Sequence, residues 1–287
     1  MSEITVVIPV WGSYCARLAA CVEDVRAQDC DAEILVVDNA SEVPLPRLPA
    51  EVRALRLAER LSVGAARNAA LADVRTRYVL FADADDRLLP GTLSFLVEML
   101  DAKPGLVAAV TKQVLWDPVC DQRMIVQRSP RPIVYRIAPF PRLLALCTLR
   151  FNVFPIVGCA ALRTNTVRSS GGFGDGNVGE DWELCAALAW RGRIGFSRRP
   201  GRLYAVEDGS LWHRDHDRST FEAQYSRFRR RLFADPAVPW WARLTRRAIT
   251  RFQRRDLDRM FRDGAYRPET ARLGHPAARG FSGRAAR

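Results

Sequence analysis

Short apolar runs alternate along the chain with stretches whose apolar side chains recur every three or four residues. The run ITVVIPV at residues 4–10 is β-branched and short, as in a buried parallel strand. Residues 14–28 show helical spacing, and EILVVD at 33–38 predicts a second buried strand. An alanine-rich helix at 64–74 and the strand YVLFAD at 78–83 repeat the order. This pattern predicts an α/β fold, with a Rossmann-like, mostly parallel central sheet flanked by helices.

Weaker patterns cover the rest of the main domain. VRALRL at 52–57 predicts a marginal strand, and Pro90 is expected to start a helix, because proline suits a first helical position. Strands are expected at 107–116 and 158–164, on either side of a proline-rich segment, and a helix at 182–192 ending at Gly192. The second half therefore resembles an α+β layer lining one side of a site.

The positive charge of the chain is concentrated near its C-terminal end. The net charge is +12, and residues 221–287 hold 17 arginines, no lysine and six acidic residues, a net of +11 that leaves +1 for the rest. We expect a main domain at 1–217, with halves at about 1–105 and 106–217. A basic helical C-terminal extension with a flexible end would follow at 218–287.

Composition excludes several classes of protein. With 287 residues, 48% of them hydrophobic, the chain can bury an ordinary core, and no apolar run is long enough for a membrane-spanning helix. The N-terminus has no basic leader, so we expect a cytoplasmic protein. Seven cysteines without a C-x-x-C pair suit neither a disulfide framework nor a zinc knuckle.

Three aspartates, Asp83, Asp85 and Asp86, crowd together directly after the strand YVLFA. Their mutual repulsion indicates that something positive is expected there. Asp38 and Asp83 end strands of the predicted sheet, where ligands of open parallel sheets bind. In extended chain Asp83 and Asp85 point to one side and could share a divalent cation together with phosphates. A solvated turn capping the next helix is the other interpretation.

Six segments are spread from about residue 4 to about 212: VVIPVWG, VVDNAS, SVGAARNAAL, FADADD, GGFGDGNVGEDWELCAALAWRG and YAVEDGSL. Taken in order, they resemble the inverting nucleotide-sugar glycosyltransferases of glycosyltransferase family 2, which have the GT-A fold. The resemblance implies metal-dependent transfer of a sugar from a nucleotide sugar to an acceptor hydroxyl. UDP is the expected nucleotide, with dTDP and GDP as alternatives. The expected acceptor is a glycan or lipid-linked molecule in cell-envelope polysaccharide or glycolipid synthesis.

The resemblance also implies which residues hold the donor. Pro9, Val10 and Trp11 would wall the nucleoside pocket, Asp38 would bond the base, and Arg67 would lie near the base or diphosphate. Asp83 would take the ribose beside Ala84, and Asp85 would hold Mn²⁺ or Mg²⁺.

On the acceptor side, the family resemblance makes Asp181 the catalytic base, with Glu180 supporting acceptor and base placement. A nucleotide sugar needs charge neutralised on its leaving diphosphate, and an alcohol nucleophile needs a carboxylate to take its proton. Without the resemblance, both acids could simply be favoured by the dipole at the start of a helix.

One position departs from the family pattern. The family often has Tyr-x-x-His-x-x-Ser, whereas Tyr204, Glu207 and Ser210 hold that frame here with glutamate in place of histidine. We assign the third metal ligand to His213, with Glu207 as the alternative, or else the metal site is weaker than usual.

Other classes of protein fit less well. GDGNVG at 174–179 matches the G-x-G-x-x-G of dinucleotide-binding enzymes, but it does not follow a first strand. A sugar-phosphate nucleotidyltransferase would need a glycine-rich phosphate loop after the first strand, where PVWGSYC stands. A nucleic-acid-binding protein is the alternative outside the enzymes, supported by the arginines and aromatic residues of the extension.

The extension also contains a basic amphipathic segment. Read as a helix, Leu244, Ala248, Phe252 and Arg255 fall along one line, with Trp241 one turn before it and arginines on both sides. Such a helix could lie on an anionic membrane, making the protein peripheral at the inner face of the cell membrane. Alternatively, its apolar stripe packs back on the main domain.

Overall fold

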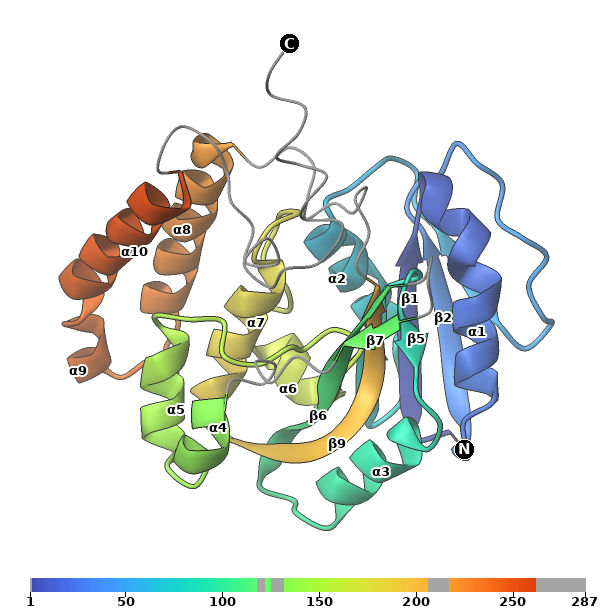
Figure 1. The fold of residues 1–287 in the computed structure, drawn as a ribbon, viewed down its shortest axis with the longest axis horizontal. Helices are drawn as coiled ribbons and strands as arrows, with labels where there is room; N and C mark the ends of the chain where they lie inside the picture. The colour runs from blue at the N-terminus through green and yellow to red at the C-terminus, as the bar shows by residue number, and fades with distance from the viewer. Residues whose placement is uncertain (1, 118–121, 125–131, 206–216, 262–287) are drawn as a thin grey trace.

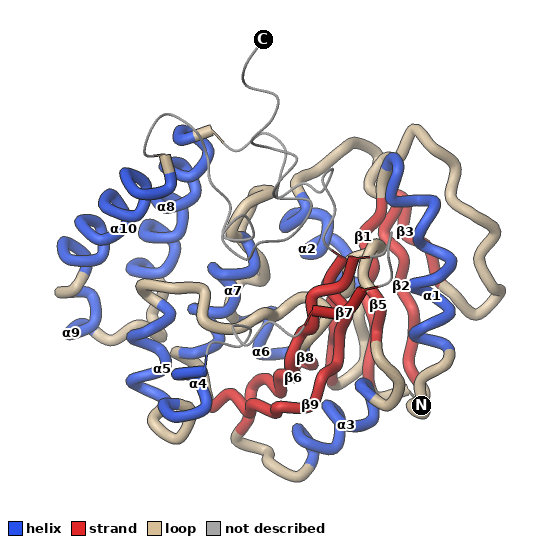
Figure 2. The backbone as a smooth tube through the Cα atoms, in the orientation of Figure 1, coloured by secondary structure: helices blue, strands red, loops and turns tan. Residues whose placement is uncertain are grey.

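A computed structural model of the chain describes residues 2–117, 122–124, 132–205 and 217–261. These residues form one twisted sheet with helices on both faces (Figures 1 and 2). The strand order is β3-β2-β1-β4-β8-β6-β9-β5, and β7 pairs with β6. The strands are β1 (Ile4–Val10), β2 (Ala32–Asp38), β3 (Arg53–Arg56), β4 (Tyr78–Phe81), β5 (Arg87–Leu88), β6 (Leu106–Asp117), β7 (Gln122–Met124), β8 (Ala160–Arg163) and β9 (Arg193–Ala205).

Helices of very different lengths connect these strands and follow them. Gly12–Arg17 forms a short 3-10 helix before α1. The α-helices are α1 (Leu18–Arg26), α2 (Val63–Asp73), α3 (Thr92–Asp101), α4 (Pro132–Ile137), α5 (Pro141–Thr148), α6 (Thr164–Ser169), α7 (Glu180–Ala189), α8 (Arg218–Ala234), α9 (Trp240–Arg243) and α10 (Arg246–Met260). Among the described residues, no helix has both the length and the apolar character needed to cross a bilayer.

The predicted parallel sheet is confirmed in the first half of the chain. β1 pairs in parallel with β2 and β4, and β2 with β3. Side chains of β1 alternate between two cores: Val7 faces α2 and α7, whereas Val6 and Ile8 face α1 and α3. The register sets Val10 beside Asp38, so the polar ends of the parallel strands meet at one edge of the sheet.

The second half joins this sheet in a mixed arrangement. β8 runs antiparallel to β4 and β6, as β5 does to β9, while β9 runs parallel to β6. The expected strands around 107–116 and 158–164 are confirmed as β6 and β8. The sequence patterns did not predict the long strand β9, nor α4 and α5 within the proline-rich segment.

The prediction that a helix starts at Pro90 is wrong, because α3 begins at Thr92. Gly91 precedes it in the left-handed region, with φ of +69°. The side chain of Gln28 accepts hydrogen bonds from the backbone N–H groups of Thr92 and Leu93, at 2.9 and 3.2 Å. A side chain from a distant segment therefore satisfies the helix start, and local sequence gives no sign of it.

The C-terminal helices pack against the rest of the molecule. The rings of Trp182 on α7 and Phe228 on α8 lie 4.3 Å apart, within a core that α10 also joins. On α10 the buried positions are Ile249, Gln253 and Leu257. The helix therefore packs on the rest of the molecule through a face other than the predicted stripe. The predicted line through Leu244, Ala248 and Phe252 does not take part, and it is exposed.

Candidate active site

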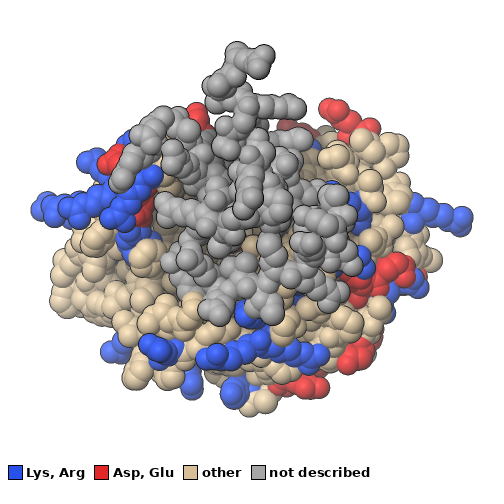
Figure 3. Space-filling view, in the orientation of Figure 1, with Lys and Arg blue, Asp and Glu red and all other residues tan. Residues whose placement is uncertain are grey.

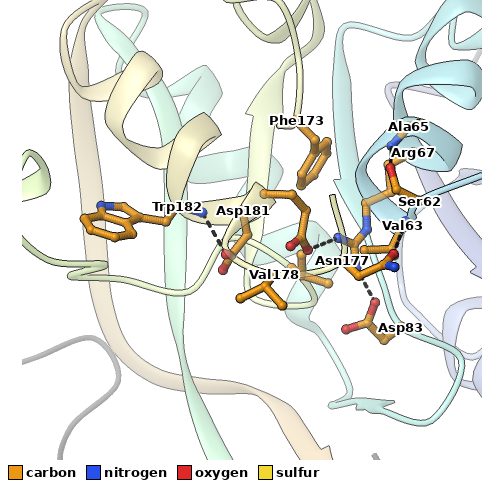
Figure 4. Close-up of polar contacts among 12 residues, drawn as sticks. Ser62, Val63, Ala65, Arg67, Asp83, Phe173, Asn177, Val178, Asp181 and Trp182 are labelled. Atoms are coloured by element: carbon orange, nitrogen blue, oxygen red, sulfur yellow. Dashed lines mark hydrogen bonds and ion pairs between the residues drawn. The ribbon is translucent and has the colours of Figure 1, made fainter. Parts of the chain in front are cut away.

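A buried arginine joins carboxylates from two separate parts of the chain. Arg67, on α2, donates to Asp83 after β4 at 2.5 Å and to Glu180 at the start of α7 at 2.7 Å. Its guanidinium also lies over the ring of Phe173, 5.1 Å from the centroid. Figure 4 shows Arg67 reaching toward Asp83, with Asp181 on the far side of the same region. Arg67 and Asp83 from the donor-side candidates and Glu180 from the acceptor-side candidates thus lie in direct contact.

A second buried arginine holds the aspartate cluster from β9. Arg202 forms an ion pair with Asp86 and lies 3.6 Å from Asp83. The other oxygen of Asp86 accepts from the backbone N–H of Ala205 at 3.2 Å. Both oxygens of Asp86 are therefore held by residues of β9, and Asp83 lies between the guanidinium groups of Arg67 and Arg202.

Among the described residues, no guanidinium group forms an ion pair with Asp85. Burial and the repulsion of Asp83 raise its pKa to about 6, although Arg202 opposes the shift. One oxygen from each of Asp83, Asp85 and Asp86 can be chosen so that all lie within 4.8 Å of one another. These hard oxygen donors suit Mg²⁺ or Mn²⁺, and a bound cation would remove the repulsion among them.

Asp181 is held by short contacts at both oxygens. Asn152 donates to its Oδ2 at 3.0 Å, and the backbone N–H of Trp182 donates to Oδ1 at 2.7 Å. Burial raises the pKa of Asp181, and these two hydrogen bonds oppose the rise. Burial and the negative charge of Asp181 raise the pKa of Glu180 to about 7. Two neighbouring acids thus differ in partners, since only Glu180 is paired with Arg67.

The glycine-rich segment before α7 is fastened to the start of α2. Ser62 caps α2 and donates to Asp175 at 2.7 Å, and the N–H of Val63 donates to Asn177 at 2.9 Å. A Cβ atom on Gly64 would lie 1.9 Å from the carbonyl oxygen of Gly174, so only glycine permits this approach. The segment follows α6 rather than a first strand, so it does not have the position of a dinucleotide-binding fingerprint.

The nucleoside-side candidates lie at the ends of β1 and β2. Pro9 and Val10 are buried, and Trp11 is partly exposed with the guanidinium of Arg60 4.3 Å from its ring centroid. Asp38 accepts from the backbone N–H of Ser41 at 2.8 Å. Its other oxygen accepts from Arg56 on β3. Ala84 is buried between the aspartates.

Several site residues were not among the sequence-based candidates. Arg202, Asn152 and Arg56 contact Asp86, Asp181 and Asp38 from other elements, and no motif marks them. The proposed third metal ligands, His213 and Glu207, lie outside the described residues.

Comparisons with known proteins identify the family and the fold of the chain. A family model described as "Glycosyl transferase family 2" matches residues 5–167. The succinoglycan biosynthesis protein ExoO of Rhizobium meliloti (strain 1021) is 26% identical over 226 residues, covering 73% of this chain and 62% of that protein. The teichoic acid poly(glycerol phosphate) polymerase of Staphylococcus epidermidis is 27% identical over 119 residues, covering 38% of this chain and 16% of that protein. The chain therefore spans less than two thirds of these relatives.

Solved structures show the same fold. The structure of S. aureus TarS 1–349 in complex with UDP-GlcNAc matches with a TM-score of 0.60 and 14% identity, covering 93% of each chain. The same protein in complex with UDP matches with a TM-score of 0.56 and 15% identity, again covering 93% of each chain. Because the family model matches more than half of the chain, the chain is a member of glycosyl transferase family 2, a glycosyltransferase of GT-A fold.

Proposed function

We propose that this glycosyltransferase is metal-dependent and inverting. It would transfer a sugar from a UDP-sugar to an acceptor hydroxyl in cell-envelope polysaccharide or glycolipid synthesis. The observation that carries the proposal is Arg67, which binds Asp83 and Glu180 at once and so joins the strand-end carboxylates to the start of α7. Such a site has the two parts that glycosyl transfer needs, a holder for the nucleotide and a base for the acceptor.

On the donor side, Pro9, Val10 and Trp11 would form the wall against the base, beside Asp38. The ribose would bond to Asp83 next to Ala84. The resemblance placed Arg67 near the base or diphosphate, but its buried position between two carboxylates supports a different role. We propose that Arg67 positions Asp83 and contributes positive charge near the diphosphate without touching it.

The metal site would use Asp85, with Asp83 nearby and His213 or Glu207 as the third ligand. A bound Mn²⁺ or Mg²⁺ would neutralise the charge that develops on the leaving diphosphate. Asp86 would not be a ligand, because Arg202 already neutralises it. The five carboxylates of the site face two buried arginines, so the site still lacks positive charge, and a divalent cation would supply it.

On the acceptor side, Asp181 would take the proton of the attacking hydroxyl as the bond from that oxygen to the anomeric carbon forms. The bond from the anomeric carbon to the diphosphate oxygen would break on the opposite side, inverting the configuration. Asn152 and the N–H of Trp182 would hold the carboxylate in place, and its raised pKa makes it a stronger base. Glu180 would fix the start of α7 through Arg67.

The substrate class is supported by the names of the relatives. One is a succinoglycan biosynthesis protein and another a teichoic acid polymerase, and the structural neighbour TarS was crystallised with UDP-GlcNAc. We further propose that the catalytic residues all lie within residues 1–217, with a donor half at about 1–105 and an acceptor half at about 106–217, while α8 completes the core around α7.

A donor screen tests the proposal. The full chain would be mixed with a panel of nucleotide sugars and Mn²⁺, and release of the nucleoside diphosphate would be followed. We expect release from one UDP-sugar and loss of release when the metal is chelated. Release that is equal with and without metal would contradict the metal-dependent part, and release from only a dTDP- or GDP-sugar would contradict the UDP part.

A further inference from the structure

A row of exposed apolar side chains follows α9 and α10. Trp240 is 73% exposed, Leu244 72% and Phe252 41%, and Ala248 between them is exposed as well. These residues are spaced by four, and the backbone at the junction of the two helices, Leu244 and Thr245, stays in the right-handed helical region. The row is therefore separate from the buried face of α10, which already faces the core.

A second row runs along α5 and its two ends. Phe140, which precedes the helix, is 62% exposed, Leu143 on the helix is 44% exposed, and Phe151, which follows the helix, is 40% exposed. Arg150 joins the two rows, because its guanidinium lies 4.4 Å from the ring centroid of Phe151 and 5.2 Å from that of Phe252. Arg150 thus links the two rows at Phe151 and Phe252, and we call the two rows together the apolar face. Its residues are Phe140, Leu143, Phe151, Trp240, Leu244 and Phe252.

Positive charge is concentrated along the α9 and α10 part of the apolar face. Residues 240–261 contain seven arginines and two aspartates. Both aspartates are already paired with arginines outside this segment, Asp256 with Arg150 and Asp258 with Arg218. The exposed arginines are Arg243, Arg246, Arg247, Arg251, Arg254, Arg255 and Arg259. Basic side chains project from the upper left edge in Figure 3, where Figure 1 places α8 and α10.

The arginines also repel one another. Burial, followed by the positive charges of Arg246, Arg254 and Arg230, lowers the pKa of Arg229 on α8. Anions beside this group would relieve the repulsion. The surface is therefore both apolar and short of negative charge.

We propose that the apolar face and its arginines dock on an anionic lipid surface. Aromatic and aliphatic side chains would enter the boundary between headgroups and acyl chains, and the arginines would hold anionic headgroups. A nucleic acid would satisfy the arginines but would leave Leu143 and Leu244 in water. An anionic bilayer offers charge and hydrocarbon together, and it complements both features of the surface.

The apolar face adjoins the acceptor side of the site. Asn152, which donates to Asp181, directly follows Phe151 in the chain. Docking would therefore hold Asp181 near the lipid, where a lipid-linked acceptor would be presented. This consequence rests on the proposed function, whereas the docking itself does not.

Flotation with vesicles tests the docking. We would use the full chain, because α8 supplies Phe221, Tyr225 and Phe228 to the core shared with α7, so a chain ending before α8 would lose part of its core. The vesicles would be phosphatidylcholine with and without phosphatidylglycerol, at low and high salt. We expect binding only with phosphatidylglycerol and a marked loss of binding at high salt, because salt screens the attraction.

Two variants separate the apolar and the charge contributions. Trp240→Ser with Leu244→Ser removes two side chains of the apolar face, and because both are largely exposed, serine should leave the fold intact. We expect flotation to fall at least tenfold. Replacing three exposed arginines on α10 by glutamine should weaken binding by roughly fivefold for each, or on the order of a hundredfold. The positions are Arg246, Arg247 and Arg251.

A matched control lies on the loop after β2. Val43→Ser with Arg47→Gln also removes an exposed apolar and an exposed basic side chain, and it should float like the wild type. Each of three results would overturn the proposal. The first is that the wild type binds neither kind of vesicle, and the second is that the wild type and the Trp240/Leu244 variant float equally. The third is that the wild type forms a dimer that the Trp240/Leu244 variant loses, while neither protein binds vesicles. Binding to RNA or DNA in place of vesicles would overturn it as well.

Discussion

Removing Arg67 gives the sharpest test of the site, because one side chain neutralises two carboxylates. Arg67→Met keeps the length of the side chain but leaves Glu180 buried without a partner, and Asp83 only partly compensated by Arg202. Breaking a buried ion pair by removing one partner costs about 3–5 kcal/mol. We therefore expect a loss of that size in the free energy of unfolding, measured by urea denaturation. Arg67→Lys should cost less but still lower turnover, since one ammonium cannot replace the two-sided guanidinium.

The loss should depend on pH. The pKa of Glu180 is raised to about 7, so the folded protein holds an extra proton between the ordinary range of a carboxyl group and pH 7. In that window, this group makes the wild type less stable as pH rises. At pH 5 Glu180 is neutral and Arg67 has little to neutralise there. The cost of Arg67→Met should therefore be larger at pH 8 than at pH 5.

A double-mutant cycle isolates the pair. Arg67→Met combined with Glu180→Gln removes the unpaired buried charge, so the double variant should be more stable than the sum of the single losses predicts, by about 1–3 kcal/mol. The control is Arg218→Met, whose partners Glu222 and Asp258 are exposed, and it should barely move the midpoint. Equal losses at the two pH values together with additive effects in the cycle would refute this account of Arg67.

Three further predictions concern the reaction and its supporting loop. Asp85→Ala should abolish Mn²⁺-dependent donor binding while the protein stays folded. In the wild type, that binding should weaken as pH falls through about 6, because protons compete with the metal at Asp85. Titration calorimetry measures both effects, and near wild-type turnover of the variant would exclude Asp85 from the metal site. Asp181→Asn should keep donor binding but lower turnover roughly 10²- to 10⁴-fold, with unchanged turnover pointing to another base. Gly64→Ala should lower the melting temperature although alanine favours helices, because its Cβ would meet the Gly174 carbonyl oxygen. Gly105→Ala is the control and should leave the melting temperature unchanged, because the space around Gly105 is open. An unchanged melting temperature for Gly64→Ala would mean that the glycine-rich segment moves away without a cost in stability.

The parallel half of the sheet could be predicted because its signals are local. Buried strands such as 4–10 and 33–38 are continuous β-branched runs, and strand ends collect at one edge whenever the strands are parallel. That is why Asp38 and Asp83 could be placed at one edge of the sheet from sequence. The same reasoning failed at Pro90, since the side chain that satisfies the start of α3 comes from Gln28.

The partners of the site could not be predicted, because they depend on distant contacts. Arg202 is 116 residues from Asp86 and is one of many arginines, so only the pairing of β5 with β9 singles it out. Asn152 follows a proline-rich stretch that was not predicted to be helical. The prediction of the buried face of the C-terminal helix failed for another reason. Several faces of an arginine-rich helix fit an amphipathic pattern, and only the packing of Ile249 and Leu257 shows which face is buried.

The C-terminal extension also supports the acceptor side of the site. Arg227 on α8 donates to Glu183 on α7 at 2.7 Å and to the carbonyl of Val178 at 3.1 Å. Arg231, one turn further, lies 3.5 Å from Glu183 and donates to the carbonyl of Gly172. Two arginines of one helix thus hold both the helix that begins with Glu180 and the glycine-rich segment before it. The helix α8, predicted from sequence as part of an extension, therefore holds the segments on which Asp181 is placed. Substitutions in α8 should lower turnover without removing a contact to the substrate.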